Sequence, residues 1–161
     1  MSRKRFDKMN CSIARALEVL GDWWTFLIIR ECFVGTRRFS DFQTNLGIAK
    51  NILSNRLQHL VDHGVLERVE VQQRGSRHEY WLTDQGKDLY TTLTALREWS
   101  DKWIMGKGKE PIVVKDSRTG KPVPPVKVLD YEGKPVNPKY LSIEPGPGAD
   151  VETRKRFKRG Y

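Results

Sequence analysis

Side chains rich in hydrogen-bond donors recur at helical spacing in the middle of the chain. They are Lys50, Asn51, Ser54, Asn55 and Gln58. The apolar residues of the same stretch, which predict the buried face of one helix, are Leu53, Leu57, Leu60 and Val61. The polar face has no carboxylate to repel phosphate, so it suits the major groove of duplex DNA, with Asn51 and Asn55 as candidates for reading bases. A solvated surface helix would have the same polar face.

Arginines on both sides of this helix are candidates for contacting phosphate. Arg37 and Arg38 precede it, and the donor-rich segment 72–77, which contains Arg74 and Arg77, follows it. Contacts to phosphate fix the orientation of a protein on the duplex but carry no sequence information. The pattern therefore predicts one base-reading helix with phosphate contacts on either side.

These side chains need a scaffold, and the surrounding sequence predicts two helices and a β-hairpin. Ser40 and Gln43 have the spacing of a capping box, so a first helix is predicted to begin at Ser40 and to end at Gly47. After a short turn the base-reading helix follows and stops at Gly64, and alternating apolar residues mark two strands between residues 65 and 82. Two helices joined by a tight turn and followed by a hairpin are the outline of a winged helix-turn-helix.

Few residues are arranged for catalysis or metal binding. His59 and His63 stand four residues apart, which can place two imidazoles on one metal ion, but two ligands rarely suffice and ordinary surface placement is favoured. No serine or cysteine has the partner pattern of a nucleophile, and neither a GxxxxGK[ST] phosphate loop nor an HExxH motif occurs. We therefore expect no enzyme activity, no metal and no cofactor.

The chain is basic, but unevenly so. Its 161 residues include 29 Lys and Arg against 20 Asp and Glu, a net charge of +9 that favours polyanions as partners. Residues 1–105 contain 16 basic and 13 acidic residues, so most of the excess lies beyond them. Overall charge is therefore weak support for DNA binding by the helix-turn-helix itself.

No stretch predicts a membrane span. The most apolar one, Trp23–Val34, is shorter than the roughly 20 apolar residues that cross a bilayer and is interrupted by Arg30 and Glu31. It predicts a buried helix capped by Asp22. The N-terminus is basic but lacks the apolar segment of a secretory signal. We expect a cytoplasmic protein without membrane contact.

Two amphipathic stretches offer apolar surface for self-association. One runs from about Gly86 to Met105 and carries Leu89, Leu93, Leu96, Trp99, Trp103 and Ile104 at spacings of three and four. The other, near the N-terminus, carries Ile13, Leu17 and Leu20. The first stripe is broader than one small domain usually needs to cover its core. A dimer interface and a monomeric core helix fit this pattern equally well.

Cys11 and Cys32 are the only cysteines, too few for a disulfide framework. Cys32 lies within the apolar stretch and is predicted to be inert packing. Cys11 precedes a predicted helix and has five basic residues near it, between Arg3 and Arg15. Because positive surroundings and a helix N-terminus favour the reactive thiolate, Cys11 is a candidate redox sensor; a small buried residue is the alternative.

The composition changes after Met105, since all eight prolines lie beyond it. This divides the chain into 1–105 and 106–161. Residues 114–123 and 128–136 form a weak repeat in which each copy predicts a short β-hairpin, with a disordered extension as the alternative. The basic end at 154–159 is predicted either to contact phosphates or to be a solvated tail.

The stretch from Cys11 to Trp103 resembles the HxlR family of bacterial winged-helix transcription regulators. The matching pieces are, in order, Cys11-Ser12-Ile13-Ala14 with Ala16-Leu17, Gly21-Asp22-Trp23-Trp24-Thr25, Arg38-Phe39-Ser40-Asp41-Phe42, Leu53-Ser54-Asn55-Arg56-Leu57, Gly64-Val65-Leu66-Glu67-Arg68, Glu79-Tyr80-Trp81-Leu82-Thr83 with Gly86, and Trp99. Their order and spacing together carry the resemblance. Trp23 departs from the family, which often has a basic residue there.

The resemblance implies a homodimeric regulator, usually a repressor, that binds an inverted repeat of DNA. It favours the dimer for the two apolar stretches and adds Arg56 to the candidates for DNA contact. It also supports Cys11 as a sensor, because some relatives detect oxidants or electrophiles with a cysteine at this position. Several relatives carry a tail with two CxxCG motifs that resembles a zinc ribbon. None of the corresponding residues here is cysteine, so two hairpins without zinc are expected.

The predicted fold is α+β and mainly helical, a winged helix-turn-helix with a C-terminal dimerisation helix and a small cysteine-less, zinc-ribbon-like β-hairpin tail. The predicted DNA-binding residues are Arg37, Arg38, Ser40, Lys50, Asn51, Ser54, Asn55, Arg56, Arg74 and Arg77. The predicted dimer interface is formed by Ile13, Leu17, Leu20, Leu89, Leu93, Leu96, Trp99 and Trp103. Double-stranded DNA and a second copy are the expected partners. The alternatives are a protein-interaction module and an architectural protein that binds DNA without sequence preference.

Overall fold

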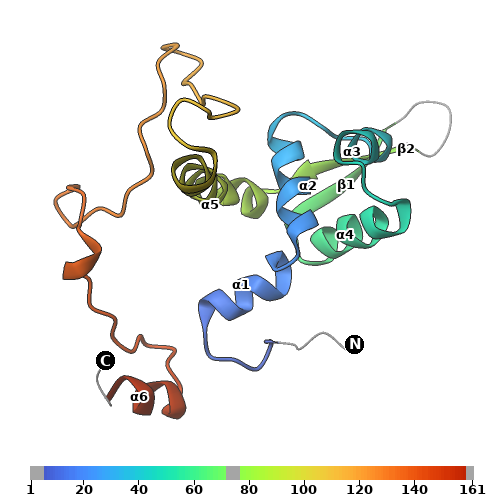
Figure 1. The fold of residues 1–161 in the computed structure, drawn as a ribbon. Helices are drawn as coiled ribbons and strands as arrows, with labels where there is room; N and C mark the ends of the chain where they lie inside the picture. The colour runs from blue at the N-terminus through green and yellow to red at the C-terminus, as the bar shows by residue number, and fades with distance from the viewer. Residues whose placement is uncertain (1–5, 72–76, 159–161) are drawn as a thin grey trace. The chain divides into compact units, whose positions relative to one another are not determined.

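The structure is a computed structural model that describes residues 6–71 and 77–158 (Figure 1). It forms two compact units. The larger unit is Val19–Val126, and the smaller consists of the described residues of 1–18 and 127–161. Helix α1 (Ser12–Leu20) begins in the smaller unit and ends in the larger.

The larger unit has the element order of a winged helix-turn-helix. Its elements are α2 (Trp23–Phe33), α3 (Phe39–Leu46), α4 (Lys50–Asp62), β1 (Leu66–Val71), β2 (Arg77–Leu82), α5 (Asp84–Ser100) and the π-helical turn η1 (Asp101–Met105). The strands pair antiparallel, with Leu66 opposite Leu82 and Val71 opposite Arg77. The predicted base-reading helix is therefore α4, and the predicted wing is the β1–β2 hairpin.

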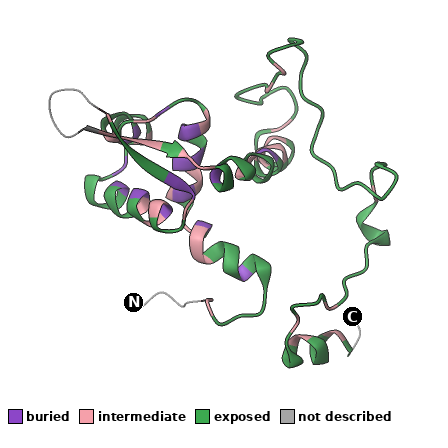
Figure 2. Ribbon diagram, turned by 180° about the vertical axis from the view of Figure 1, so that it is seen from behind, coloured by how far each residue is buried: buried purple, intermediate pink, exposed green. Residues whose placement is uncertain are grey.

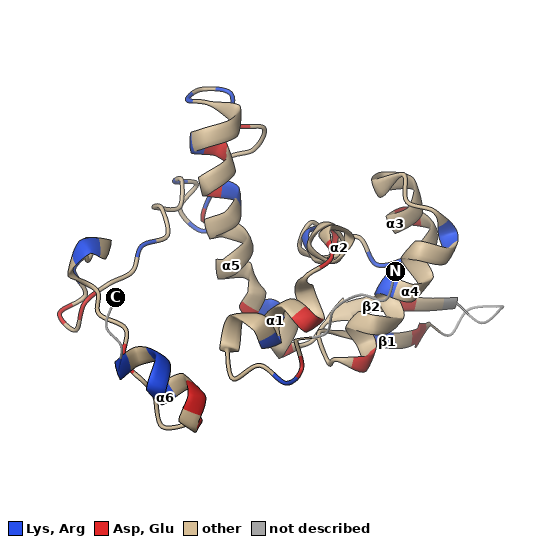
Figure 3. Cartoon of the chain, turned by 60° about the horizontal axis from the view of Figure 1, so that its bottom comes forward, with Lys and Arg blue, Asp and Glu red and all other residues tan. Residues whose placement is uncertain are grey.

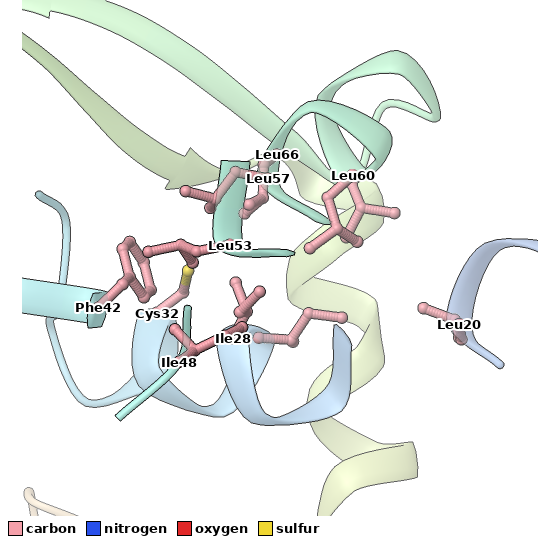
Figure 4. Close-up of a cluster of buried hydrophobic side chains, with 11 residues drawn as sticks. Leu20, Ile28, Cys32, Phe42, Ile48, Leu53, Leu57, Leu60 and Leu66 are labelled. Carbon is pink, nitrogen blue, oxygen red and sulfur yellow. The ribbon is translucent and has the colours of Figure 1, made fainter. Parts of the chain in front are cut away.

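The core of this unit lies among α2, α3, α4 and the hairpin. Its largest fully buried side chains include Ile28, Ile29, Phe42, Leu53, Leu57, Leu60 and Leu66 (Figure 4). In Figure 2 the buried segments concentrate in this core. The C-terminal extension, residues 106–161, is exposed along nearly the whole of its described length. The three leucines of α4 are buried as their spacing predicts, so the opposite face of α4 is left to solvent.

The predicted start of α3 is wrong. Arg38 occupies the N-cap position without a side-chain hydrogen bond, and Ser40 lies inside the first turn, where its hydroxyl donates to the Asp41 carboxylate over 3.0 Å. The reason is a contact distant in sequence. The Tyr80 N–H donates to the Arg37 carbonyl over 2.9 Å, and Arg38 forms a β-bridge with Glu79, so the chain stays extended until Arg38 and enters the helix directly. Gly47 ends α3 in the left-handed region, as predicted.

The start of α5 is fixed against the end of α4. The Thr83 hydroxyl accepts the Gly86 N–H over 3.1 Å and donates to the Gly64 carbonyl over 2.6 Å. Gly86 lies so close to Val65 that a Cβ atom there would collide with the Val65 carbonyl oxygen. The beginning of α5 is therefore a rigid part of the larger unit.

The predicted hairpins of the extension are reduced to two turns. The Val123 N–H donates to the Val114 carbonyl over 3.0 Å and the Val136 N–H to the Val128 carbonyl over 3.0 Å, but each copy has a single β-bridge instead of paired strands. The bridges involve Pro122 and Pro135. Proline has no N–H to donate, which prevents a longer ladder. The internal repeat is thus present in the structure, without strands.

A C-terminal helix, α6 (Val151–Lys158), is present where the sequence predicted either phosphate contacts or a solvated tail. The Asn10 side chain holds its N-terminal end, since Nδ2 donates to the Gly148 carbonyl over 3.1 Å and Oδ1 accepts from the Asp150 N–H and the Thr153 hydroxyl. In the part of the chain that the structure describes, no helix is long and apolar enough to cross a membrane.

Candidate nucleic-acid interface

The outer face of α4 carries the predicted base-reading side chains. Lys50, Asn51, Ser54 and Asn55 are all exposed, in the first two turns of the helix. Ala49, at the N-cap position, offers no side-chain acceptor, so the first N–H groups of α4 also remain free of a side-chain cap. A helix N-terminus with exposed donors carries partial positive charge, which favours phosphate nearby. The arrangement presents hydrogen-bond donors and positive potential on one solvent-facing surface.

Arg56 is less available than its neighbours on α4. Its guanidinium pairs with the Asp22 carboxylate at 3.1 Å, and the other oxygen of Asp22 accepts the Trp24 N–H over 3.0 Å, capping α2 as predicted. Arg56 is half-buried and its Nε atom is buried without a hydrogen bond. The side chain therefore links α4 to the start of α2, and a phosphate would have to compete with Asp22 for it.

The two arginines before α3 differ in their surroundings. Arg37 donates to the Cys32 carbonyl over 2.6 Å and to the Thr36 carbonyl over 2.8 Å, and its guanidinium lies 4.4 Å from the centre of the Trp81 ring. Arg38 is 59% exposed and makes one long ion pair, 3.4 Å, with Glu79. Arg37 therefore acts within the protein, whereas Arg38 is the side chain that phosphate can reach. Figure 3 shows how the basic and acidic residues are distributed over the chain.

Two predicted wing contacts fall where the structure gives no side-chain position. Arg74 lies outside the described residues. The backbone of Arg77 begins β2, but its side chain is likewise outside them. Ser40 is exposed at the start of α3, on the same helix-turn-helix as α4.

A buried polar network that the sequence analysis missed joins α2, α3 and the loop between them. The Glu31 carboxylate accepts hydrogen bonds from Arg30 at 2.7 Å, the Thr36 hydroxyl at 2.8 Å and the Asn45 amide at 2.8 Å. Burial by itself would raise the pKa of Glu31, but the three hydrogen bonds outweigh it and hold the pKa below its ordinary value. The available signal in the sequence is a carboxylate within an otherwise apolar helix.

The histidine pair is engaged with the backbone. The His59 Nε2 lies 3.1 Å from the Val19 carbonyl oxygen and the His63 Nδ1 lies 2.8 Å from the His59 carbonyl oxygen, so each ring nitrogen acts as a donor there. Among the residues described, no three His, Cys, Asp or Glu side chains are grouped to hold a metal ion. His59 thus connects α4 to α1, and His63 contacts the backbone of the last turn of α4.

The two cysteines differ in their exposure to solvent. Cys32 is 1% exposed and packs in the core, and burial raises the pKa of its thiol to about 12, which disfavours the reactive thiolate. Cys11 is exposed, just before α1. It lines an open cleft of about 790 Å³ within the smaller unit, together with Lys8, Glu144 and Phe157 among others.

The fold and the exposed α4 face define a winged-helix DNA-binding protein. The sequence profile of the HxlR-like helix-turn-helix family matches residues 19–108, more than half of the chain. The chain belongs to this family. It is an HTH-type transcriptional regulator that binds DNA, and not an enzyme.

Relatives extend the similarity beyond the helix-turn-helix. The HTH-type transcriptional regulator Rv3095 of Mycobacterium tuberculosis is 38% identical over 137 residues, which cover 85% of this chain and 87% of the relative. The crystal structure of PA1607, described as a candidate transcription factor, has a TM-score of 0.81 and 37% identity and covers 88% of this chain and 99% of PA1607. Coverage this large includes part of the extension. The redox regulator HypR in its reduced form has a TM-score of 0.53 at 25% identity and covers 56% of this chain and 90% of HypR.

Proposed function

We propose that the protein is a homodimeric repressor that reads an inverted repeat with the exposed face of α4. The observation that carries this proposal is the set of donors on that face, Lys50, Asn51, Ser54 and Asn55, held outward by the buried leucines of the same helix. Asn51 and Asn55 read bases, because a side-chain amide can pair bidentately with adenine. Lys50, Ser40 and Arg38 contact phosphates, with Arg74 and Arg77 of the wing on the flank.

Arg37 and Arg56 have a positioning role in this proposal. Both are tied to the protein itself, Arg37 to two carbonyl groups and Arg56 to Asp22. They hold the start of α3 and the body of α4 in place, so that the exposed donors meet the groove in a fixed orientation. DNA contact by either would require exchange of an existing partner.

The dimer is supported by apolar side chains that the chain leaves uncovered. Ile13 and Leu17 of α1, and Leu96, Trp99 and Trp103 of α5 and η1, are all exposed. Leu20, Leu89 and Leu93 instead pack in or against the core of their own chain, so the exposed five carry the interface. In a two-fold dimer, paired α4 helices enter major grooves about 34 Å apart, which requires a palindromic operator. An operator that overlaps a promoter excludes polymerase, and such a regulator acts in the cytoplasm.

Cys11 makes the repressor responsive to electrophiles or oxidants. The thiol is exposed, and similarity to the redox regulator HypR supports this role. A quinone adds to the thiolate and leaves a bulky group at the start of α1, next to the exposed Ile13 and Leu17. Quinone treatment is expected to weaken operator binding by the wild type and not by Cys11→Ser. Unchanged affinity of the treated wild type excludes the switch.

Selection of bound duplexes from a random pool, at physiological salt, tests the main proposal. Enrichment of an inverted repeat is expected, and binding without enrichment indicates an architectural protein. Asn51→Ala and Asn55→Ala should each reduce discrimination between the operator and its mismatched variants by about 1 to 3 kcal/mol. Thr92→Ala, an exposed polar substitution on α5, is the control and should change nothing.

A further inference from the structure

The end of α5 and the first part of the extension, up to Val126, border an open apolar groove of about 840 Å³ in the larger unit. One wall is formed by Trp99 and Trp103, and the other by Ile112, Val113, Val123 and Val126. All six side chains are exposed. Apolar side chains on both walls of a groove distinguish this segment from a solvated, proline-rich linker, whose side chains would be mostly polar.

The second wall is held in place. The Val126 N–H donates to the Glu98 carboxylate of α5 over 2.9 Å, which fixes the far end of the wall. Within the wall, the Asp116 N–H donates to the Lys121 carbonyl over 2.9 Å, and the Val123 N–H donates to the Val114 carbonyl over 3.0 Å, which closes the turn. The groove is therefore a built feature of the larger unit.

We propose that this groove receives a second copy of the chain, so that residues 107–126 form part of the dimer interface. The inference rests on the proposed dimer and extends it from the helices to the extension. Residues 107–126, which are not part of the helix-turn-helix, would then contribute to dimerisation.

The exposed indoles supply part of the area that a second copy would have to cover. A buried tryptophan side chain removes up to about 250 Å² from water, so the exposed fractions of 56% for Trp99 and 66% for Trp103 leave on the order of 300 Å² of indole. A stable interface needs about 800 Å² from each partner. The indoles alone fall well short of that area, and the four aliphatic side chains of the second wall enlarge the same surface without a break.

The charge of the rim favours a second copy over a nucleic acid. The charged residues that line the groove are the basic Arg97, Lys102 and Lys107 and the acidic Glu98, Asp101 and Glu110. Arg97 already pairs with Asp101 at 3.0 Å and with Glu98 at 3.7 Å within the chain, so the rim has no excess of either sign that would repel the same patch on a second copy. A surface for phosphates would have an excess of basic residues.

Sedimentation velocity of the full chain over a range of concentrations tests this inference through the dimer Kd. Ile112→Ser with Val113→Ser removes two aliphatic groups from the second wall and should raise the Kd about 10- to 100-fold. Val128→Ser with Leu129→Ser is the matched control, because it also changes two neighbouring exposed aliphatic residues of the extension, outside the groove. The control should leave the Kd unchanged.

A second pair of variants tests the position of the wall. Glu98→Ala removes the acceptor for the Val126 N–H, whereas Glu98→Gln keeps an oxygen in its place. The Kd should rise for Glu98→Ala and stay close to the wild-type value for Glu98→Gln. A wild-type dimer whose Kd is insensitive to the serine variants overturns the role of the groove and leaves the proposed repressor intact. A wild type that is monomeric at every concentration overturns both the groove and the proposed dimer.

Discussion

The helix-turn-helix and the region that follows Leu93 differ in the burial of their large apolar side chains. In α2, α3 and α4 most of the large aliphatic and aromatic residues pack in one core, where Phe42, Leu53 and Leu57 are completely buried, and Trp23 and Ile52 are the exposed exceptions. From Leu96 to Val126 the large apolar residues remain exposed, two tryptophans among them. The core of the first region is complete within one chain. The second has the composition of an interface and lacks the surface that would cover it.

The two regions also differ in what their charged side chains connect. Glu31 is buried and bonded to three groups from α2, α3 and the loop between them, so it holds separate elements together. In the extension, the Asp116–Arg118 and Glu132–Lys134 pairs join residues two apart and are largely exposed. Such local pairs shape a turn but connect it to nothing else, and exposed ion pairs contribute little to stability. These pairs therefore hold the two turns, and the Val126–Glu98 hydrogen bond is what connects the extension to α5.

The largest effect on stability should come from comparing leucine-to-alanine substitutions in the two regions. Leu57→Ala removes a fully buried side chain and should lower the free energy of unfolding by about 2 to 5 kcal/mol. Leu96→Ala makes the same chemical change at a half-exposed position and should cost about 0.5 kcal/mol or less below the dimer Kd. Urea unfolding at low protein concentration measures both. Similar losses for the two variants would remove the distinction between a complete and an incomplete region.

The same distinction explains what the sequence could predict. Leu53, Leu57 and Leu60 were assigned to the core from their spacing, and Gly47 and Gly64 to helix ends, because helical periodicity and left-handed glycine are local properties. The start of α3 was misplaced because Arg38 is held extended by Glu79, 41 residues away. The contacts of Arg37 with Trp81 and of Arg56 with Asp22 could not be predicted for the same reason, since these partners lie on other elements. The turns of the extension were anticipated from the repeat, but Pro122 and Pro135 limit them to single bridges.

The buried network around Glu31 gives the next largest effect, and it depends on pH. Since hydrogen bonds hold the folded-state pKa of Glu31 below its ordinary value, its contribution to stability is complete above that ordinary value. The contribution is lost as the pH falls through the lowered folded-state pKa. Glu31→Gln turns an amide N–H₂ towards groups that donate, so it should cost about 1 to 3 kcal/mol at neutral pH.

Thermal unfolding between pH 7 and the acid limit of folding checks this prediction. The wild type should lose stability more steeply at acid pH than Glu31→Gln, because the variant has no carboxylate to protonate. Glu70→Gln, on the exposed face of β1, is the control and should follow the wild-type curve. Parallel curves for the wild type and Glu31→Gln would show that ionisation of Glu31 does not stabilise the folded chain.

The smallest expected effect is the difference between alanine variants of the adjacent Arg37 and Arg38 in stability and in the salt dependence of DNA binding. Arg38 is exposed and makes one long ion pair, so Arg38→Ala should leave stability nearly unchanged and reduce the slope of log K against log salt by about 1. Arg37 is bonded to two carbonyl groups and stacked on Trp81, so Arg37→Ala should lower stability and leave the slope as it is. Fluorescence anisotropy with a labelled operator at several salt concentrations measures the slopes. If the slope falls for Arg37→Ala instead, Arg37 exchanges its carbonyl partners for a phosphate when DNA binds. The helix-turn-helix would then change its internal contacts on binding, although its core is already packed in the free protein.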